Sequence, residues 1–348
     1  MRVLIATIKV PFVRGGAEIH AEGLRNALCD AGHEAEIVAL PFKWYPPERI
    51  LDQMLACRLL DLSESAGTPV DRMIGLKFPA YLIPHPNKVL WILHQHRPAY
   101  DLWGAFGGDL IHYPNGAQIC HVIRQVDRQL IPQASMVFTN SANVSRRLKQ
   151  YCGIDSTPLY HPPQQAEQFY SAAAEDYFFF PSRLQPLKRQ ALVVEALFHT
   201  RQPVCVRFAG APDHPEYAVA LTALARKLNV QRRVEWRGYV SEEEKRSLYA
   251  HALGIIFPPV DEDYGYVALE AMLSSKPVIT CTDSGGPLEF VRAGESGFIT
   301  EPTPAALAMA MDQLCEDRAR AKCMGEEGFA HYQRLEISWP KVVQRLLS

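Results

Sequence analysis

One stretch decides the fold: Gly254-Ile-Ile-Phe257, the polar loop from Pro258 to Tyr264, Gly265-Tyr-Val-Ala-Leu-Glu-Ala-Met-Leu273, and Pro277-Val-Ile-Thr280. The first and last of these segments are short apolar runs beside proline, which is typical of buried β-strands. The segment between them has the length and composition of a helix, with a glycine at its start. A strand, a helix and a strand in this order predict parallel strands of one sheet.

The same alternation extends from this stretch toward the middle of the chain. Apolar strands alternate there with helices of about ten residues, which predicts a doubly wound, Rossmann-like parallel sheet. The further strands are expected at Tyr177–Phe180, Val204–Ala209 and Val234–Arg237, and the further helices at Gln190–Leu197, Ala218–Leu228 and Ser241–Ala250.

The first half of the chain shows this pattern around a second set of strands. A helix from about Glu18 to Ala31 follows the first strand, and Gly32 is suited to end it. A later helix begins after the last strand and is capped by Ser141 or by Asn143. The strands are expected at Val3–Ile8, Glu36–Leu40, Lys88–Leu93 and Met136–Thr139.

A proline-rich break, Pro158-Leu-Tyr-His-Pro-Pro163, separates the two halves. We therefore expect an α/β fold with two Rossmann-like, doubly wound parallel-sheet domains, residues 1–165 and 166–332. The tail from residue 333 to residue 348 contains an amphipathic segment with no strand after it. We expect this tail to form a helix that packs back on the first domain.

The composition of the 348 residues is that of a globular protein. Hydrophobic residues make up 48% and charged residues 21%, which excludes a disordered chain, collagen and a coiled coil. The net charge of −2 offers no polycationic surface for nucleic acid. No apolar run approaches the roughly 18 residues of a spanning helix, and the N-terminal apolar run is too short for a signal peptide. We expect a cytoplasmic protein whose eight cysteines are reduced and mostly buried.

The loop after the strand that ends at Phe257 is the densest candidate site. Ligands of open α/β sheets bind beyond the carboxyl ends of the strands, where this loop lies. The next helix opens with backbone N–H groups that suit a phosphate, and Glu262 and Glu270 flank them as acceptors for sugar and ribose hydroxyls. These N–H groups belong to Gly265, Tyr266 and Val267. The alternative is that Asp261-Glu262-Asp263 only complements the helix dipole.

The segment from Glu262 to Glu270 resembles the E-x7-E signature of retaining GT-B glycosyltransferases, especially glycosyltransferase family 4, with Tyr264 at the aromatic position of its E-x-F-G form. The resemblance covers nearly the whole chain through three further motifs. It implies a GT-B fold with a deep cleft between two domains. It also implies that a nucleotide diphosphate sugar binds to the second domain and an acceptor to the first.

The first further motif is Ser182-Arg183-Leu-Gln-Pro-Leu-Lys188-Arg189, which is similar to the G-R-L-x-x-x-K-G element of the family. The resemblance implies that Arg183 and Lys188 clamp the donor diphosphate. A planar guanidinium and a mobile ammonium are a suitable pair for a leaving diphosphate. Ser182 and Arg189 depart from the family's glycines without changing these cations. The alternative is a solvated basic turn.

Two glycine pairs complete the resemblance. Asp283-Ser-Gly285-Gly286-Pro287-Leu-Glu289 is similar to the family's glycines and acid after the next strand, and Glu289 is either a helix cap or a donor-site residue. Arg14-Gly15-Gly16-Ala17-Glu18 is similar to the family's first loop, which implies that Gly15 and Gly16 face the donor phosphate. The chain has no G-x-G-x-x-G fingerprint in this loop, which disfavours NAD binding.

His94 and His96 follow a strand of the first domain. Many family members carry a histidine at this strand end, which implies that His94 contacts the donor sugar, and His96 is the second choice. A metal site is the less favoured alternative, because an H-x-H pair needs further ligands that the sequence does not offer. We therefore expect no metal and no cofactor. The neighbouring Arg97, Tyr100 and Asp101 are expected, with His96, on the acceptor side.

Two further segments have both a structural and a functional interpretation. Gly238 and Tyr239 lie in a loop that resembles the one that holds the nucleotide base in the family, and Ser241 with Glu244 forms a capping box beside it. The basic residues of the helix after Ser141 form either a solvated face or a peripheral contact with the inner face of an anionic membrane. They are Arg146, Arg147 and Lys149.

The resemblance implies a retaining glycosyltransferase that moves a sugar from a UDP- or GDP-sugar to a hydroxyl of a saccharide or glycolipid, in the synthesis of a surface polysaccharide. The residues that it implies to be catalytic are Glu262, His94, Arg183 and Lys188. A sugar-nucleotide epimerase of the same fold and a non-catalytic module that binds sugar nucleotides are the alternatives. The sequence does not predict an oligomeric state.

Overall fold

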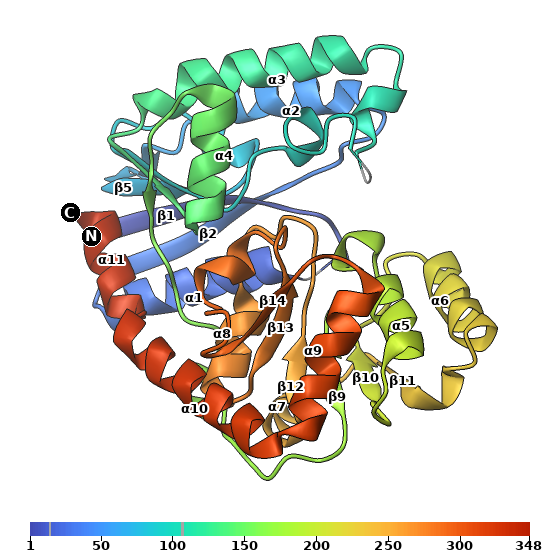
Figure 1. Cartoon of the computed structure of the whole chain (residues 1–348). Coiled ribbons are helices and arrows are strands. Elements are labelled where there is room, and N and C mark those ends of the chain that lie inside the picture. The colour runs from blue at the N-terminus through green and yellow to red at the C-terminus, as the bar shows by residue number, and fades with distance from the viewer. Residues whose placement is uncertain (14, 106–107) are drawn as a thin grey trace. The chain divides into compact units, whose positions relative to one another are not determined.

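The computed structural model describes residues 1–13, 15–105 and 108–348 (Figure 1). The chain divides into two compact units, which we call unit 1 (Met1–Gln164 with Ser338–Ser348) and unit 2 (Gln165–Ile337). Each unit has its own six-stranded sheet, and every strand pair in these two sheets is parallel. The expected α/β class with two parallel sheets is confirmed.

The sheet of unit 1 has the strand order β2-β1-β5-β6-β7-β8. β5 was not expected from the sequence, although it lies between β1 and β6 and pairs with both. Its four residues are too few to show a clear period. The strands are β1 (Arg2–Lys9), β2 (Glu34–Pro41), β5 (Arg72–Gly75), β6 (Lys88–Ile92), β7 (Met136–Thr139) and β8 (Thr157–Pro158), and a small antiparallel pair comprises β3 (Glu64–Ser65) and β4 (Thr68–Pro69).

Helices cover both faces of this sheet, as Figure 1 shows. Alternate residues of β6 point to opposite faces, so Leu90 and Ile92 pack in a core with α2, α3 and α4, while Val89 and Trp91 pack in a core with α1 and α11. Burial on both faces explains the continuous apolar run of this strand. The helices are α1 (Gly16–Asp30), α2 (Glu48–Leu59), α3 (Gly116–Leu130), α4 (Ala142–Cys152) and α11 (Trp339–Leu347).

The N-terminal cap of α4 is Ser141, one of the two expected candidates. Its Oγ accepts a hydrogen bond from the backbone N–H of Val144 at 3.0 Å. Gly153 ends the helix with a φ of 74°, in the left-handed region that favours glycine. Local sequence therefore determines both ends of this helix.

The C-terminal helix α11 belongs to unit 1, but it is shorter than the expected 333–348. Residues 333–335 belong instead to α10 (Arg318–Leu335), whose C-terminal cap Glu336 has a left-handed conformation. Pro340 is in the first turn of α11, where proline is favoured. The Trp339 ring stacks on His161, with ring centroids 5.4 Å apart. The guanidinium of Arg72 donates to the carbonyl of Leu346 at 2.7 Å, which ties the end of α11 to β5.

The sheet of unit 2 has the strand order β11-β10-β9-β12-β13-β14. All the strands and helices expected in this unit occur, with ends shifted by a few residues, while β14, α9 and α10 were not expected. The strands are β9 (Phe178–Pro181), β10 (Val206–Ala209), β11 (Val234–Gly238), β12 (Gly254–Ile256), β13 (Val278–Cys281) and β14 (Gly297–Thr300). The helices are α5 (Gln190–His199), α6 (Pro215–Lys227), α7 (Glu242–His251), α8 (Tyr266–Leu273), α9 (Pro304–Glu316) and α10 (Arg318–Leu335).

Two observations bear on the expected cellular compartment. The eight cysteines form no disulfide, but the expectation that they are mostly buried is wrong: only Cys57, Cys120 and Cys281 are buried, and Cys29 and Cys323 are exposed. Within residues 1–13, 15–105 and 108–348, no helix has both the length and the apolar character needed to cross a bilayer.

Candidate functional site

The loop after β12 and the loop after β13 lie side by side at the carboxyl edge of the unit 2 sheet. The backbone N–H of Glu262 donates to the carbonyl of Ser284 at 2.9 Å, and the N–H of Gly286 donates to the carbonyl of Glu262 at 2.8 Å. The N–H of Asp261 donates to the carbonyl of Asp283 at 2.9 Å. Two motifs that the sequence identified separately therefore form one site.

Glycine is required at two points where these loops meet. A Cβ on Gly286 would lie 2.8 Å from the backbone carbon of Tyr264, and a Cβ on Gly265 would lie 2.6 Å from the Phe290 ring. Gly265 is also the N-terminal cap of α8, so the close packing places the start of this helix against the loop after β13. Because Gly265 and Gly286 have no side chain, the start of α8 can pack directly against the loop after β13.

Lys188 and Glu262 form an ion pair in this site. Their side chains are 15% and 25% exposed, so the pair is partly shielded from water. The Lys188 ammonium also lies 5.3 Å from the centre of the Phe257 ring, at the end of the strand that leads into the acidic loop. The backbone N–H of Val260 donates to the carbonyl of Leu187 at 2.8 Å. The structure therefore brings the predicted cation to the predicted carboxylate.

Arg183, the other predicted cation, is half exposed and pairs with Asp213, with Nη1 and Oδ1 2.7 Å apart. Asp213 follows β10, and the sequence analysis missed it because a lone aspartate after a strand is common in loops. The backbone of Arg183 is held by Gln190, whose Nε2 donates to its carbonyl at 2.8 Å. Arg183 thus has a fixed backbone and a guanidinium that solvent reaches.

Arg189 stands where the resembling motif has glycine, and its φ is 60°, in the left-handed region that glycine adopts most easily. Its guanidinium donates to both carboxylate oxygens of Asp283, at 2.6 and 2.5 Å. This hydrogen bonding raises the pKa of Arg189. The bidentate pair links the cationic loop after β9 to the glycine loop after β13.

Glu270 lies on α8 and is only 9% exposed. Tyr249 Oη donates to its Oε2 at 2.7 Å, and Lys245 Nζ lies 3.1 Å from its Oε1. Burial disfavours the charge of Lys245, but Glu270 and Glu242 outweigh it and raise the pKa of Lys245. Lys245 and Tyr249 were not predicted, although their spacing of four residues on α7 puts them on one helix face. Glu270 is therefore a buried carboxylate that accepts hydrogen bonds from Tyr249 and Lys245.

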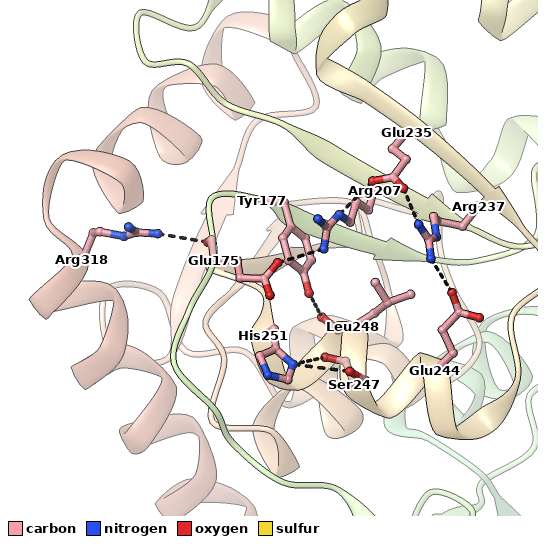
Figure 2. A network of polar contacts seen from close by, with 10 residues as sticks. All are labelled: Glu175, Tyr177, Arg207, Glu235, Arg237, Glu244, Ser247, Leu248, His251 and Arg318. Carbon is pink, nitrogen blue, oxygen red and sulfur yellow. Dashed lines mark hydrogen bonds and ion pairs between the residues drawn. The ribbon is translucent and has the colours of Figure 1, made fainter.

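The loop that carries Gly238 and Tyr239 is held from both sides, as Figure 2 shows for its charged residues. Arg237 Nη2 donates to Glu244 Oε1 at 2.7 Å, and Ser241 Oγ accepts from the backbone N–H of Glu244 at 3.1 Å. The expected cap at Ser241 is confirmed. Gly238 has a φ of 63°, and the Tyr239 side chain is 84% exposed and available to a ligand.

The network of Figure 2 continues from this loop across the sheet. Glu235 binds both Arg237 and Arg207, at 2.5 and 2.9 Å. The Arg207 guanidinium lies 3.7 Å from the centre of the Tyr177 ring and pairs with Glu175 at 3.2 Å. The network therefore joins β10, β11 and the segment just before β9 to α7.

In unit 1, the predicted glycine loop opens α1. Gly15 is the N-terminal cap, and its N–H donates to Glu18 Oε2 at 2.8 Å; Gly16 is the first helical residue. Arg14, which precedes them in the motif, lies outside the described residues. The loop is thus a helix start at the carboxyl end of β1.

His94 follows β6 and is half-buried, with Nδ1 2.6 Å from the carbonyl oxygen of Gln95. His96 packs instead among aromatic rings, 5.3 Å from Phe78 and 6.2 Å from Phe42 between ring centres. Burial, with a contribution from His94, lowers the pKa of His96 to about 3, so this ring is neutral at physiological pH. Both histidines are partly buried, and the choice between them for the donor sugar stays a prediction.

The predicted acceptor-side residues Arg97, Tyr100 and Asp101 do not form one surface. Arg97 pairs with Asp101 at 2.7 Å. Tyr100 is 3% exposed and donates to Asp127 Oδ2 at 2.7 Å, so it lies in the core of unit 1. The structure therefore gives no support to an acceptor contact by the Tyr100 side chain.

The basic face expected on α4 is wrong for Arg147, which is 6% exposed and lies 3.4 Å from Asp101. Arg146 donates to Asn143, and Lys149 pairs with Asp155 at 2.7 Å. The tertiary structure turns Arg147 inward to the carboxylate of Asp101, which the helical spacing alone could not reveal.

Among the residues that the structure describes, no group of three or more His, Cys, Asp or Glu could hold a metal ion.

Comparison with known proteins agrees with this geometry. Residues 164–331 match the family model "Glycosyl transferases group 1". The chain is 28% identical over 243 residues to D-inositol 3-phosphate glycosyltransferase of Nocardia farcinica, covering 64% of this chain and 53% of that protein. It is 32% identical over 119 residues to alpha-1,3/1,6-mannosyltransferase ALG2 of Dictyostelium discoideum, covering 34% and 28%. The matches thus span about half, or less, of these relatives.

Solved structures match the chain over nearly its full length. Sucrose-phosphate synthase from Thermosynechococcus elongatus superposes with a TM-score of 0.76 at 18% identity, over 99% of this chain and 97% of that chain. HepE of Anabaena, in complex with UDP-glucose, has a TM-score of 0.74 at 17% identity, over 100% and 98%. At such identities the likeness shows the fold. Residues 164–331 are therefore similar to a group 1 glycosyl transferase domain, and the chain has the GT-B fold.

Proposed function

We propose that this chain transfers a sugar from a nucleotide diphosphate sugar to a hydroxyl group of a saccharide or glycolipid. The observation that carries the proposal is at the carboxyl edge of the unit 2 sheet, where Lys188 pairs with Glu262 in the loop that leads into α8, and Arg183 follows β9 at the same edge. Cations and a helix N-terminus suit a diphosphate, and a carboxylate suits sugar hydroxyls.

The ion pairs of this cluster indicate how the donor binds. Lys188 pairs with Glu262, and Arg183 pairs with the acid Asp213. A diphosphate is a stronger partner for both cations than a single carboxylate, because it carries more charge. Binding of the donor then exchanges these pairs for contacts with phosphate and leaves Glu262 to accept from the sugar. Arg183 and Lys188 stabilise the charge that develops on the leaving diphosphate.

The finer assignments rest on the motif resemblance and on the relatives. We assign UDP or GDP as the nucleotide, retention of anomeric configuration, no metal requirement, and a role in surface polysaccharide synthesis in the cytoplasm. The similar HepE structure holds UDP-glucose, and the TarM structure of S. aureus holds UDP with fondaparinux and alpha-GlcNAc-glycerol, which supports a nucleotide-sugar donor and a saccharide acceptor.

A panel of nucleoside diphosphates and their sugars, scored by thermal unfolding, tests the donor. A ligand at about 100 times its Kd stabilises a protein by about 2.7 kcal/mol, so the true nucleotide stands out from the panel. The best donor is then incubated alone and with saccharide acceptors. Transfer to an acceptor supports the proposal. An epimerised sugar from the donor alone would identify an epimerase, and binding without turnover would identify a non-catalytic module.

A further inference from the structure

A pocket of about 640 Å³ lies within unit 1, and none of the predicted site residues of unit 1 lines it. It is at the amino-terminal edge of the sheet, because Lys88 is the first residue of β6, whereas His94 follows the end of that strand. Its polar lining consists of Arg58, Asp61, Ser63, His85, Lys88 and Gln133. Nothing in the proposed sugar transfer uses this edge.

Lys88 is the central residue of this pocket, and it is only 4% exposed. Its Nζ donates to the backbone carbonyls of Tyr81 and Ile83 at 3.4 and 3.2 Å, two long hydrogen bonds to neutral acceptors. Among the described residues it forms no ion pair with a carboxylate. A buried ammonium without an anion is costly, because burial removes its water without replacing the charge interaction.

The other charged residues of the pocket do not supply that anion. Arg58 is a second cation, held by one bond from Nη1 to the carbonyl of Leu82 at 2.8 Å. Burial and, next, Arg58 lower the pKa of Lys88 to about 8. The carboxylate of Asp61 instead accepts from the N–H and the Oγ of Ser63, at 2.9 and 2.6 Å.

Lys276 of unit 2 shows that burial of a lysine alone does not make a site. It is 5% exposed, it donates to the carbonyl of Ala172 at 2.9 Å, and burial lowers its pKa to about 8. Lys88 combines its burial with an open volume beside it and with the neighbouring guanidinium of Arg58.

We infer that the pocket around Lys88 and Arg58 binds a phosphate group, either as a small soluble phosphate or as the headgroup of an anionic lipid. The guanidinium and the ammonium each donate to the phosphate oxygens, and the amide of Gln133 is a further donor in the lining. This site does not depend on the proposed transferase activity, since it shares no residue with the donor cluster.

Inorganic phosphate is the first probe, with ionic strength held constant by sodium chloride so that screening does not vary. Calorimetric titration should show saturable binding to the wild-type protein. Arg58→Gln should raise the Kd about tenfold or more, because it removes a charge-assisted hydrogen bond. Lys88→Met should abolish binding and, without phosphate, should unfold at a higher temperature than the wild type.

Two control variants separate phosphate binding at this pocket from binding at other lysines of the chain. Lys276→Met removes an equally buried lysine elsewhere and should leave phosphate binding unchanged. Lys188→Ala removes a cation of the proposed donor site, where phosphate could also bind, and should leave binding at the Lys88 pocket unchanged, so failure of the transferase proposal would not affect this test. Lys188→Ala protein that binds no phosphate at constant ionic strength, or binding in this background that survives both Arg58→Gln and Lys88→Met, would overturn the inference.

Vesicle sedimentation distinguishes the two phosphate sources. Neutral phosphatidylcholine vesicles are compared with vesicles that also contain phosphatidic acid. Binding to the acidic vesicles that Lys88→Met abolishes would assign a lipid headgroup. Saturable binding of inorganic phosphate without vesicle binding would assign a soluble phosphate. Vesicle binding that is the same in Lys88→Met and the wild type would count against the lipid source.

Discussion

Lys188 and Glu262 form an ion pair in the structure; under the proposed function, a phosphate replaces Glu262 as the partner of Lys188, and Glu262 accepts from sugar hydroxyls. Asp213 pairs with Arg183, and Asp283 pairs with Arg189. At the scale of single residues, the proposed donor site therefore consists of ion pairs, and a bound diphosphate would replace the carboxylate partners of its cations. Its members differ in exposure, since Arg183 is half exposed and Lys188 is largely covered.

Substitution of Lys188 by alanine should lower turnover more than donor binding. The charge on the leaving diphosphate grows toward the transition state, and loss of one such interaction typically costs about 10² to 10³ in rate. The same holds for Arg183→Ala. Initial rates at saturating donor, together with donor affinity by calorimetry, provide the measurement. Lys322→Ala, on the exposed side of α10, is the matched control. Wild-type turnover in Lys188→Ala would refute the clamp assignment.

Glu270→Gln should weaken nucleotide binding by about 1 kcal/mol, because a neutral amide replaces a charged acceptor for ribose hydroxyls. Tyr249→Phe is the informative partner variant, since it removes a bond to Glu270 and leaves the carboxylate in place. If Glu270 contacts the ribose, only Glu270→Gln should change affinity strongly. A change in unfolding temperature for both variants without a change in nucleotide affinity would identify Glu270 as purely structural.

At the scale of elements, the attachment of α11 depends on a cluster of rings. His20 on α1 and His161 lie with Nδ1 and Nε2 2.8 Å apart, against Trp91 and beneath Trp339. Burial holds the pKa of His20 well below its usual range and lowers the pKa of His161 to about 3. Both rings are therefore neutral when α11 is packed.

This cluster should make unit 1 sensitive to acid. In the unfolded chain both histidines take up a proton near pH 6.5, whereas in the folded protein the pKa of His161 is about 3 and the pKa of His20 is also lowered by burial. Stability should therefore fall as the pH drops below about 6.5. Burial raises the pKa of Asp127 to about 7, which opposes this trend, because the folded protein then holds an extra proton.

Urea unfolding at pH 7 and pH 5 measures this effect. The midpoint should be lower at pH 5, the drop should be smaller in His20→Gln, and it should be larger in Asp127→Asn, which lacks the opposing group. Trp339→Ala should lower stability by about 2 kcal/mol at either pH, since the ring is only partly buried. Phe198→Ala, on an exposed position of α5, is its control. Equal midpoints for the wild type at both pH values would contradict the role of the histidine pair.

At the scale of the whole molecule, two units with separate sheets and cores carry the proposed reaction. Arg183, Lys188 and the start of α8, which we propose for the diphosphate, are in unit 2, whereas Gly15 and Gly16, which the resemblance also assigns to the donor phosphate, are in unit 1. His94 and His96 are in unit 1, and the His96 ring packs against Phe42 and Phe78. In the H-x-H pair, one of the two imidazole rings therefore contacts aromatic side chains.

Sugar transfer should therefore continue in excess EDTA. The cations and the helix start already supply the positive potential that a metal ion would otherwise bring to the diphosphate. Transfer is measured with and without chelator, and then after addition of Mg²⁺ or Mn²⁺. Complete loss in EDTA with recovery on addition of metal would overturn the metal-independent mechanism.

The sequence by itself determined the order of most strands and helices, the cap at Ser241, and a choice of Ser141 or Asn143 for the cap of α4, and it predicted the donor motifs. These features depend on neighbours within a few residues, so their signals are local. The α/β class follows from the same alternation. Weak local signals account for the elements that were missed, such as the four-residue β5.

Only the tertiary structure decided which residues meet. Lys188 and Glu262 are 74 positions apart, and Arg189 and Asp283 are 94 apart, so no spacing rule could pair them. The same is true of Tyr100 and Arg147, whose polar groups turn inward to Asp127 and Asp101. Their place depends on which strands lie side by side. Long-range packing, rather than local pattern, therefore set the chemistry of the site.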